Sequence, residues 1–395
     1  MSTPDTFSGK AVLTLAHVAG MVDMVALPVW IGTLMQHYAY SPPQAGITVT
    51  LFLLGVVAAS LFFAPRFNRL PRGAAAATGF AVAAVAFAVA SRQPVAVASF
   101  GLLAGLHALA GLGVGCALTF THGSIGRSAN PHRLFALVNV VLGVFAVAFL
   151  GGLPQLIAHV SATMLFTVIA GTMALAAFVC AFAFPTIQDG PRAAEALASA
   201  QQAKVPAAAW FVIGAVMCLT LNQAMVFSFV ERIGAARGFG VDRVNGVLIA
   251  LGLVNLTPGL LAALLQKKWS PTIVGIVGPL GQAALALVMS SALAFMPYAV
   301  AAAFYVFMVI FTHTFLFGLL SRLDPTGRAA AATPAMMMVG SCIGPALGGA
   351  IVQGLGYPGL GYAACVVAVV AVVAMLQVRR LLRAETLPAL HAAHA

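Results

Sequence analysis

Long apolar segments recur along the whole chain and leave only short polar connections between them. Each segment is about 20 residues long, the length that an α-helix needs to cross the hydrocarbon core of a bilayer. Only 7% of the 395 residues are charged, against about 25% in soluble proteins, and the mean hydropathy is +1.04. The sequence therefore predicts an all-α integral membrane protein, with the lipid bilayer as its partner.

Proline, glycine and charge clusters divide the chain into twelve predicted spans. They are residues 11–36, 43–65, 73–91, 95–122, 132–157, 160–185, 206–232, 242–266, 271–291, 297–321, 329–355 and 358–378. One longer polar connection follows the sixth span. We therefore predict an N-terminal six-helix bundle over residues 1–185, a cytoplasmic linker over 186–205, and a C-terminal six-helix bundle with a short cytoplasmic tail over 206–395.

The basic residues are distributed unevenly between the two sides of these spans. With the N-terminus inside, fifteen of the 19 Lys and Arg residues fall on the inner side. This bias is what the positive-inside rule requires, so we expect both termini in the cytoplasm. It also accounts for the net charge of +11, and no basic patch interleaved with aromatic residues indicates a nucleic-acid partner.

The second half of the chain repeats the first. The stretch 41–46, which opens the second span, aligns with 241–246 at an offset of 200 residues. The pair Gly126-Arg127 aligns with Gly327-Arg328 at an offset of 201. Two parallel six-span halves are typical of transporters that bind their substrate between the halves, near the middle of the bilayer.

Residues 64–72 resemble a loop of the major facilitator superfamily that usually reads Gly-x-x-x-Asp-Arg-x-Gly-Arg. Arg69 and Arg72 stand at the two arginine positions, whereas Asn68 replaces the aspartate. The resemblance covers the whole chain and implies two pseudo-symmetric six-helix bundles, a monomer, and, for a bacterial member, location in the inner membrane. It also implies gating roles for Arg69, Arg72, Arg127 and Arg328.

The sequence Gly-x-x-x-Gly-Pro-x-x-Gly-Gly occurs at 340–349. In the drug and proton antiporters of the family this pattern belongs to span five, whereas here it lies in span eleven. It therefore does not predict antiport.

Asp23 is the one acidic residue placed deep inside a predicted span. Such a group costs about 2.5–3.5 kcal/mol on insertion, so its default interpretation is functional. Its repeat counterpart is Gln223, and the resemblance implies that both face a central cavity. We predict that Asp23 carries a coupling proton. The alternative is a carboxyl group that only packs against a neighbouring helix.

Histidines are the second group that can carry protons, and His17 lies on the same span as Asp23. We predict that His17 takes part in proton coupling, although a histidine in a span is often a satisfied interior residue. His17, Met21 and Met24 share one helical face, so a soft-metal site is a further alternative.

Other polar and aromatic residues are expected to line the substrate cavity. They are Trp30, His107, Phe120, Asn139, Asn222, Gln223, Phe227, Tyr305 and His313. No Lys or Arg is expected near the middle of the spans, which favours a neutral, cationic or weakly acidic substrate. Glu231 and Arg232, at the outer end of span seven, are predicted gating residues; attraction of an anionic substrate is the alternative.

Catalysis has no support in the sequence. It contains no Ser/His/Asp arrangement, no HExxH and no phosphate loop, and its five cysteines show no CxxC spacing, so no cofactor or metal is predicted. We predict a secondary transporter that moves a small organic molecule by alternating access with proton coupling. The alternatives are an exporter of apolar or cationic drugs, a non-transporting membrane sensor, and a copper importer.

Overall fold

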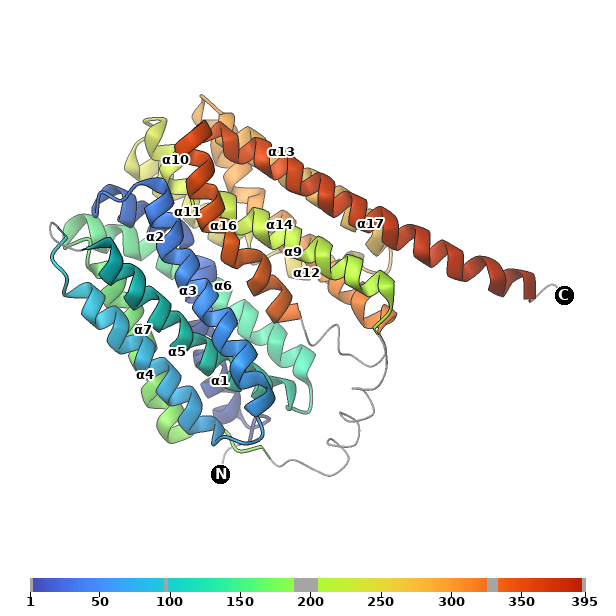
Figure 1. Ribbon diagram of the computed structural model, residues 1–395, viewed down its shortest axis with the longest axis horizontal. Helices are drawn as coiled ribbons and strands as arrows, with labels where there is room; N and C mark the ends of the chain where they lie inside the picture. The colour runs from blue at the N-terminus through green and yellow to red at the C-terminus, as the bar shows by residue number, and fades with distance from the viewer. Residues whose placement is uncertain (1–2, 96–98, 188–204, 325–332, 393–395) are drawn as a thin grey trace.

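The computed structural model describes residues 3–95, 99–187, 205–324 and 333–392. Helices form nearly all of this part of the chain (Figure 1). In chain order they are α1 (Phe7–Gly20), α2 (Val22–Gln36), α3 (Pro42–Phe63), the short 3-10 helix η1 (Ala64–Arg66), α4 (Arg72–Ser91), α5 (Phe100–Gly126), α6 (Pro131–His159), α7 (Met164–Ala183), α9 (Ala207–Phe227), α10 (Val230–Ala236), α11 (Val241–Val254), α12 (Pro258–Leu265), α13 (Pro271–Ser291), α14 (Phe295–Leu323), α16 (Thr333–Leu355) and α17 (Pro358–Ala392).

Twelve helical segments in the described residues are long and apolar enough to cross a membrane, which confirms the predicted number. Three of the twelve consist of two helices with a break between them. They are Phe7–Gln36 (α1 and α2), Ala207–Ala236 (α9 and α10) and Val241–Ala262 (α11 and α12). The apolar pattern did not predict these breaks, because each interrupted segment is apolar overall.

Local geometry explains where the breaks fall. Pro258 begins α12, and its ring removes the backbone N–H that would continue α11. At the other two breaks, the residues that cap the second helix have closely similar backbone angles. Met21 has φ −104° and ψ 18°, and Phe229 has φ −108° and ψ 4°. Met21 also caps the end of α1, whereas the end of α9 is capped by Ser228, one residue before Phe229.

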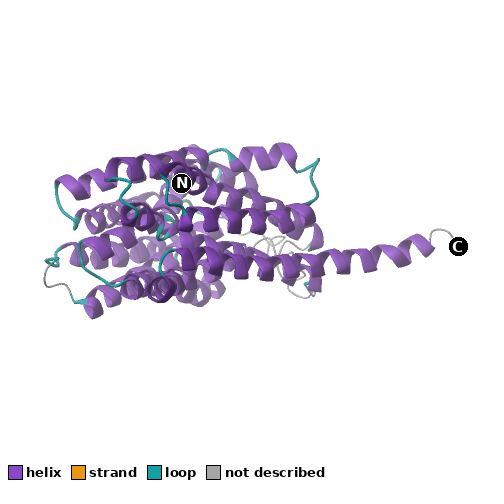
Figure 2. Ribbon diagram, turned by 90° about the horizontal axis from the view of Figure 1, so that it is seen from above, coloured by secondary structure: helices purple, strands orange, loops and turns teal. Residues whose placement is uncertain are grey.

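The helices pack into two groups that follow the two halves of the sequence. Helices α1 to α7 pack on one another, with α5 against α3 and α4, and α4 against α7. Helices α9 to α17 form the second group, with α13 against α14 and α17, and α9 against α16 and α17. The helices run nearly parallel to one another in both views (Figures 1 and 2). We call these groups the N-terminal and C-terminal bundles.

The two bundles meet along α3 and α16 and along α6 and α11. Figure 1 shows α16 beside α3. A side-chain carbon added to Gly46 would overlap the backbone of Pro345, and one added to Gly349 would overlap the backbone of Pro42. The Ala346 N–H donates to Thr50 Oγ1 at 3.1 Å. We call this end, where α2 ends, α3 begins and α16 ends, the closed end.

The last helix is longer than predicted. The expected span ended at residue 378, whereas α17 continues to Ala392 and projects beyond the bundles (Figure 2). Arginines at 379, 380 and 383 end the apolar run, but arginine is a good helix former, so the backbone continues as a helix.

Candidate functional site

Asp23 lies in the first turn of α2, directly after the break at Met21. Its side chain is only 1% exposed, and its Oδ1 atom has no hydrogen-bond partner among the described residues. The first turn of a helix has free N–H groups and the positive end of the helix dipole, which favours an acidic side chain there. The structure therefore holds a buried carboxyl group at the start of a half-helix inside the first span.

His17 occupies the last turn of α1, on the other side of the same break. Its Nδ1 is 3.0 Å from Nε2 of His122 on α5, so the two imidazoles share a hydrogen bond. His17 is 2% exposed, and its Nε2 has no partner among the described residues. The sequence did not predict that His17 and His122 meet, because the two histidines are 105 residues apart.

Trp30 and His107 contact each other inside the N-terminal bundle. The Trp30 Nε1–H donates to His107 Nε2 at 3.0 Å, and His107 Nδ1 lies 2.6 Å from the Leu103 carbonyl oxygen. Phe87 and Phe166 pack edge-on against the imidazole. Both side chains are 0% exposed, so in this conformation they form bundle core rather than an open cavity wall.

A comparable polar network holds the C-terminal bundle together. The Asn222 Nδ2 group donates to the Ala364 carbonyl at 3.0 Å, and the Tyr305 hydroxyl donates to the Asn222 carbonyl at 2.6 Å. Gln282 Nε2 donates to the Leu219 carbonyl at 3.0 Å. These bonds join α9 to α13, α14 and α17. The sequence reasoning did not select Gln282, although its amide is 0% exposed.

The other predicted cavity residues have different surroundings. Gln223 is buried and its Oε1 has no partner among the described residues, and Phe227 is buried on the same helix. Asn139 is exposed on α6 and donates to the Phe135 carbonyl at 2.7 Å. His313 stacks on Phe317 with a centroid distance of 4.8 Å. Phe120 is buried, and its ring stacks on that of Phe67.

Glu231 lies in the first turn of α10, directly after the break at Phe229. Its carboxylate packs on Gly32 of α2, and a side-chain carbon added to Gly32 would overlap that carboxylate. The neighbouring Arg232 Nη1 donates to Gln36 Oε1 at 3.3 Å. Both predicted gating residues therefore contact the opposite bundle at the closed end.

The remaining arginines near Glu231 contact uncharged groups. Arg237 Nη2 donates to the Ser290 carbonyl at 3.3 Å, and the Arg243 guanidinium lies 5.5 Å from the centre of the Phe295 ring. His37 follows α2 at the same end. Partial burial and the nearby Arg232 guanidinium lower the pKa of His37.

The loop that carries the family motif forms a cluster at the opposite end of the N-terminal bundle. Asn68 Oδ1 accepts hydrogen bonds from Arg72 Nη2 and Arg127 Nη2, each at 3.3 Å, and both guanidinium groups lie over the Phe67 ring. Asn68 thus connects the two arginines although it carries no charge. Arg69 is exposed, and Arg328 lies outside the described residues.

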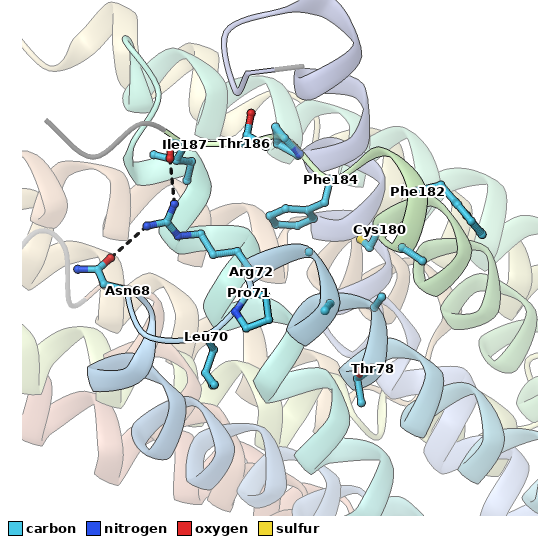
Figure 3. Close-up of a pocket in the computed structure, with 15 residues that line it drawn as sticks. Asn68, Leu70, Pro71, Arg72, Thr78, Cys180, Phe182, Phe184, Thr186 and Ile187 are labelled. Atoms are coloured by element: carbon cyan, nitrogen blue, oxygen red, sulfur yellow. Dashed lines mark hydrogen bonds between the residues drawn. The ribbon is translucent and has the colours of Figure 1, made fainter. Parts of the chain in front are cut away.

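An open groove of about 760 Å³ runs beside this loop, between α4 and α7. In Figure 3 the Arg72 side chain reaches from α4 to the Ile187 carbonyl and to Asn68, and Phe184 lies next to it. The groove lies within the N-terminal bundle and contains none of the predicted cavity residues. In the described part of the chain, no group of three or more His, Cys, Asp or Glu side chains is arranged to hold a metal ion.

Two six-helix bundles that meet at one end, with interrupted spans and carboxyl groups beside two of the breaks, have the architecture of a membrane transporter. The chain matches the family model of the Major Facilitator Superfamily over residues 12–341. It therefore belongs to this superfamily and is an MFS transporter.

Solved structures show the same fold. A crystal structure of a D-xylose-proton symporter is 18% identical with a TM-score of 0.72, over 94% of this chain and 97% of that one. The inward-open xylose transporter XylE from E. coli is 18% identical with a TM-score of 0.67, over 94% and 95%. An inward-facing bacterial homologue of the human lysosomal transporter Spinster is 16% identical with a TM-score of 0.68, over 96% and 94%. A comparison with curated proteins found no match.

Proposed function

We propose that this protein is a secondary transporter that moves a small organic molecule across the membrane and couples that movement to protons through Asp23. The observation that carries the proposal is the position of Asp23, buried beside a helix break with an unpartnered carboxyl oxygen. An ionised carboxyl group is expensive in a membrane span, so a group kept there without a full set of partners is best explained by proton binding.

His17 and His122 extend this proton site. Two imidazoles joined by one hydrogen bond can exchange a proton along that bond, and His17 stands at the end of α1, where the helix dipole favours a cation. His122 is partly exposed, whereas His17 is buried. The pair therefore offers a route between an accessible imidazole and the interior of the first span.

Alternating access is supported by how the bundles meet. Their contacts at the closed end depend on glycines and on a few polar bonds, which two rigid bodies can break and re-form. The distribution of basic residues supports an outer location for the closed end, with both termini in the cytoplasm of a bacterial cell. The structure then corresponds to an inward-facing state of a monomer.

The cavity residues that remain open to a substrate are fewer than the sequence suggested. Gln223 and Asn222 each have an amide oxygen without a partner among the described residues, and Asn139 is exposed, whereas Trp30, His107 and Tyr305 have their polar groups bonded inside a bundle. An amide-lined site without basic residues suits a neutral or cationic organic molecule.

Replacement of Asp23 by Asn tests proton coupling. In proteoliposomes with an internal pH indicator, the native protein should move protons when its substrate is added, whereas Asp23→Asn should retain substrate binding and lose proton movement. A thermal-shift screen against neutral and cationic metabolites identifies the substrate, because a bound ligand raises the apparent stability. Normal proton-coupled transport by Asp23→Asn would refute the proposal, and ligand binding without any flux would indicate a sensor.

A further inference from the structure

Glu231 is the second carboxyl group that the fold places next to a helix break. Asp23 and Glu231 are each the second residue after the residue that caps their half-helix, Met21 and Phe229, and those two residues have nearly equal backbone angles. The sequence repeat pairs Asp23 with Gln223, which lies one turn before the second break. In local structure, the counterpart of Asp23 is therefore Glu231.

What distinguishes Glu231 from Asp23 is that its carboxylate contacts the opposite bundle. The carboxylate lies on the backbone of Gly32, at a spot that only a residue without a side chain leaves free. Beside it, Arg232 donates to Gln36 across the same boundary. In the closed end, α10 therefore holds Glu231 against α2.

The groups around Glu231 determine how its charge affects closure. On its own helix Arg232 is the adjacent cation, but its guanidinium is directed to Gln36, and Arg237 at the end of the helix donates to the Ser290 carbonyl. From α14, the Tyr298 hydroxyl donates to the Val230 carbonyl at 2.8 Å rather than to the carboxylate. From α2 the facing residues are Gly32 and Gln36, followed by His37, and α11 and α13 contribute no charge beyond the exposed Asp242 and Arg243 at the start of α11.

We propose that Glu231 is a second proton-binding site and that it acts as a latch, taking up one proton from the aqueous side when the closed end forms. When the bundles separate at this end, the carboxylate leaves Gly32 and becomes hydrated, and it releases the proton to the same side. The step is a simple protonation of a carboxylate by solvent. Removing the charge before packing against Gly32 avoids the cost of a dehydrated anion.

A direct consequence is that pH sets the ratio of open to closed molecules at this end. This inference rests on the proposed alternating access but needs neither substrate nor flux to be tested. In a variant without the five native cysteines, spin labels at Arg92→Cys and Leu293→Cys report the distance between the bundles by pulsed electron paramagnetic resonance. For one proton, the ratio should rise by up to about tenfold per pH unit as pH increases.

Three variants test the contact itself. Glu231→Gln should stay closed at every pH, whereas Asp242→Asn, an exposed carboxylate at the same end, should behave like the native protein. Gly32→Ala should lose the closed population, and Gly32→Ala with Glu231→Ala should regain it without pH dependence, because the shortened side chain leaves room for the added carbon. Gly214→Ala, where the added carbon meets open space, is the control for a glycine change.

His37 also titrates at this end, and its protonation opposes closure through Arg232, so all measurements are repeated in a His37→Gln background. The latch would be refuted if the ratio of open to closed molecules in Glu231→Gln depended on pH as it does in the native protein. It would also be refuted if the double variant Gly32→Ala with Glu231→Ala stayed open. If Asp23→Asn retains coupled transport, the proton-coupling proposal fails. The distances between the spin labels still test whether Glu231 acts as a latch. A protein that stays closed at every pH, in all variants, would refute both proposals.

Discussion

At the scale of single residues, the structure separates polar groups that are fully bonded from those that are not. His107 accepts from Trp30 and contacts the Leu103 carbonyl, so its two ring nitrogens are both occupied. Asp23, Gln223 and His17 each keep a buried polar atom without a partner. An unmade hydrogen bond in the interior is costly, so such atoms mark the positions where a proton or substrate is expected to bind.

The Trp30–His107 bond should contribute to stability rather than to transport. Trp30→Phe removes the donor and leaves His107 Nε2 buried without a partner, at a cost of about 1–3 kcal/mol. We expect a lower Tm in a thermal unfolding assay of the detergent-solubilised protein. Trp210→Phe is the control, because Trp210 is 62% exposed. An unchanged Tm in Trp30→Phe would show that the bond adds nothing to the fold.

The pKa of His37, in the N-terminal bundle, responds to the charge of Arg232 in the C-terminal bundle. Burial lowers the pKa of His37, and the positive charge of Arg232 lowers it further. Because the folded-state pKa is depressed, the neutral imidazole favours the folded form, and this contribution is lost as pH falls. Arg232→Gln should raise the His37 pKa toward its ordinary value, as measured by NMR titration of the imidazole. An unchanged pKa would mean that Arg232 does not lie near His37 in solution.

At the scale of helices, breaks and close contacts matter more than helix number. The break at Met21 places His17 and Asp23 at the facing ends of two half-helices. The break at Phe229 places Glu231 at the start of a half-helix. Glycines then allow α3 and α16 to touch backbone to backbone at Gly46 and Gly349. These contacts concern only the closed end.

The α3–α16 contact can be disturbed by a single methyl group. Gly349→Ala places a carbon against the backbone of Pro42 and Pro43, whereas Gly354→Ala on the same helix meets open space. Overpacking of this kind costs about 1–3 kcal/mol. Hydrogen exchange of the amides at 44–50 should become faster in Gly349→Ala and stay unchanged in Gly354→Ala. Equal exchange in both variants would show that this contact does not hold the closed end together.

At the scale of the whole molecule, the distribution of charge predicts how the two bundles are oriented in the membrane. The positive-inside rule predicts that the connection before α13 is cytoplasmic and that the one before α14 is outside. The closed end then faces outward. This orientation determines which side of the membrane supplies the proton for Glu231.

Cysteine accessibility tests the orientation. Ser270 and Ala294 are exposed at opposite ends of α13, so both tolerate a small change. In intact cells a membrane-impermeant maleimide should label Ala294→Cys and leave Ser270→Cys unlabelled until the cells are opened. The reverse pattern would show that the molecule has the opposite orientation, with the closed end on the cytoplasmic side.

The sequence alone determined the class of protein, because the length of an apolar segment and its flanking charges are local properties that govern how the segment inserts into a bilayer. It also singled out Asp23, since a lone carboxyl group in an apolar run needs no tertiary information to be unusual. The tertiary structure decided which groups meet. His122 bonds to His17, Trp30 occupies His107, and Glu231 packs on Gly32, each between residues far apart in the chain. Such contacts depend on how each helix is rotated and on where helices break, and hydropathy reveals neither. The helix breaks make Glu231 the local counterpart of Asp23.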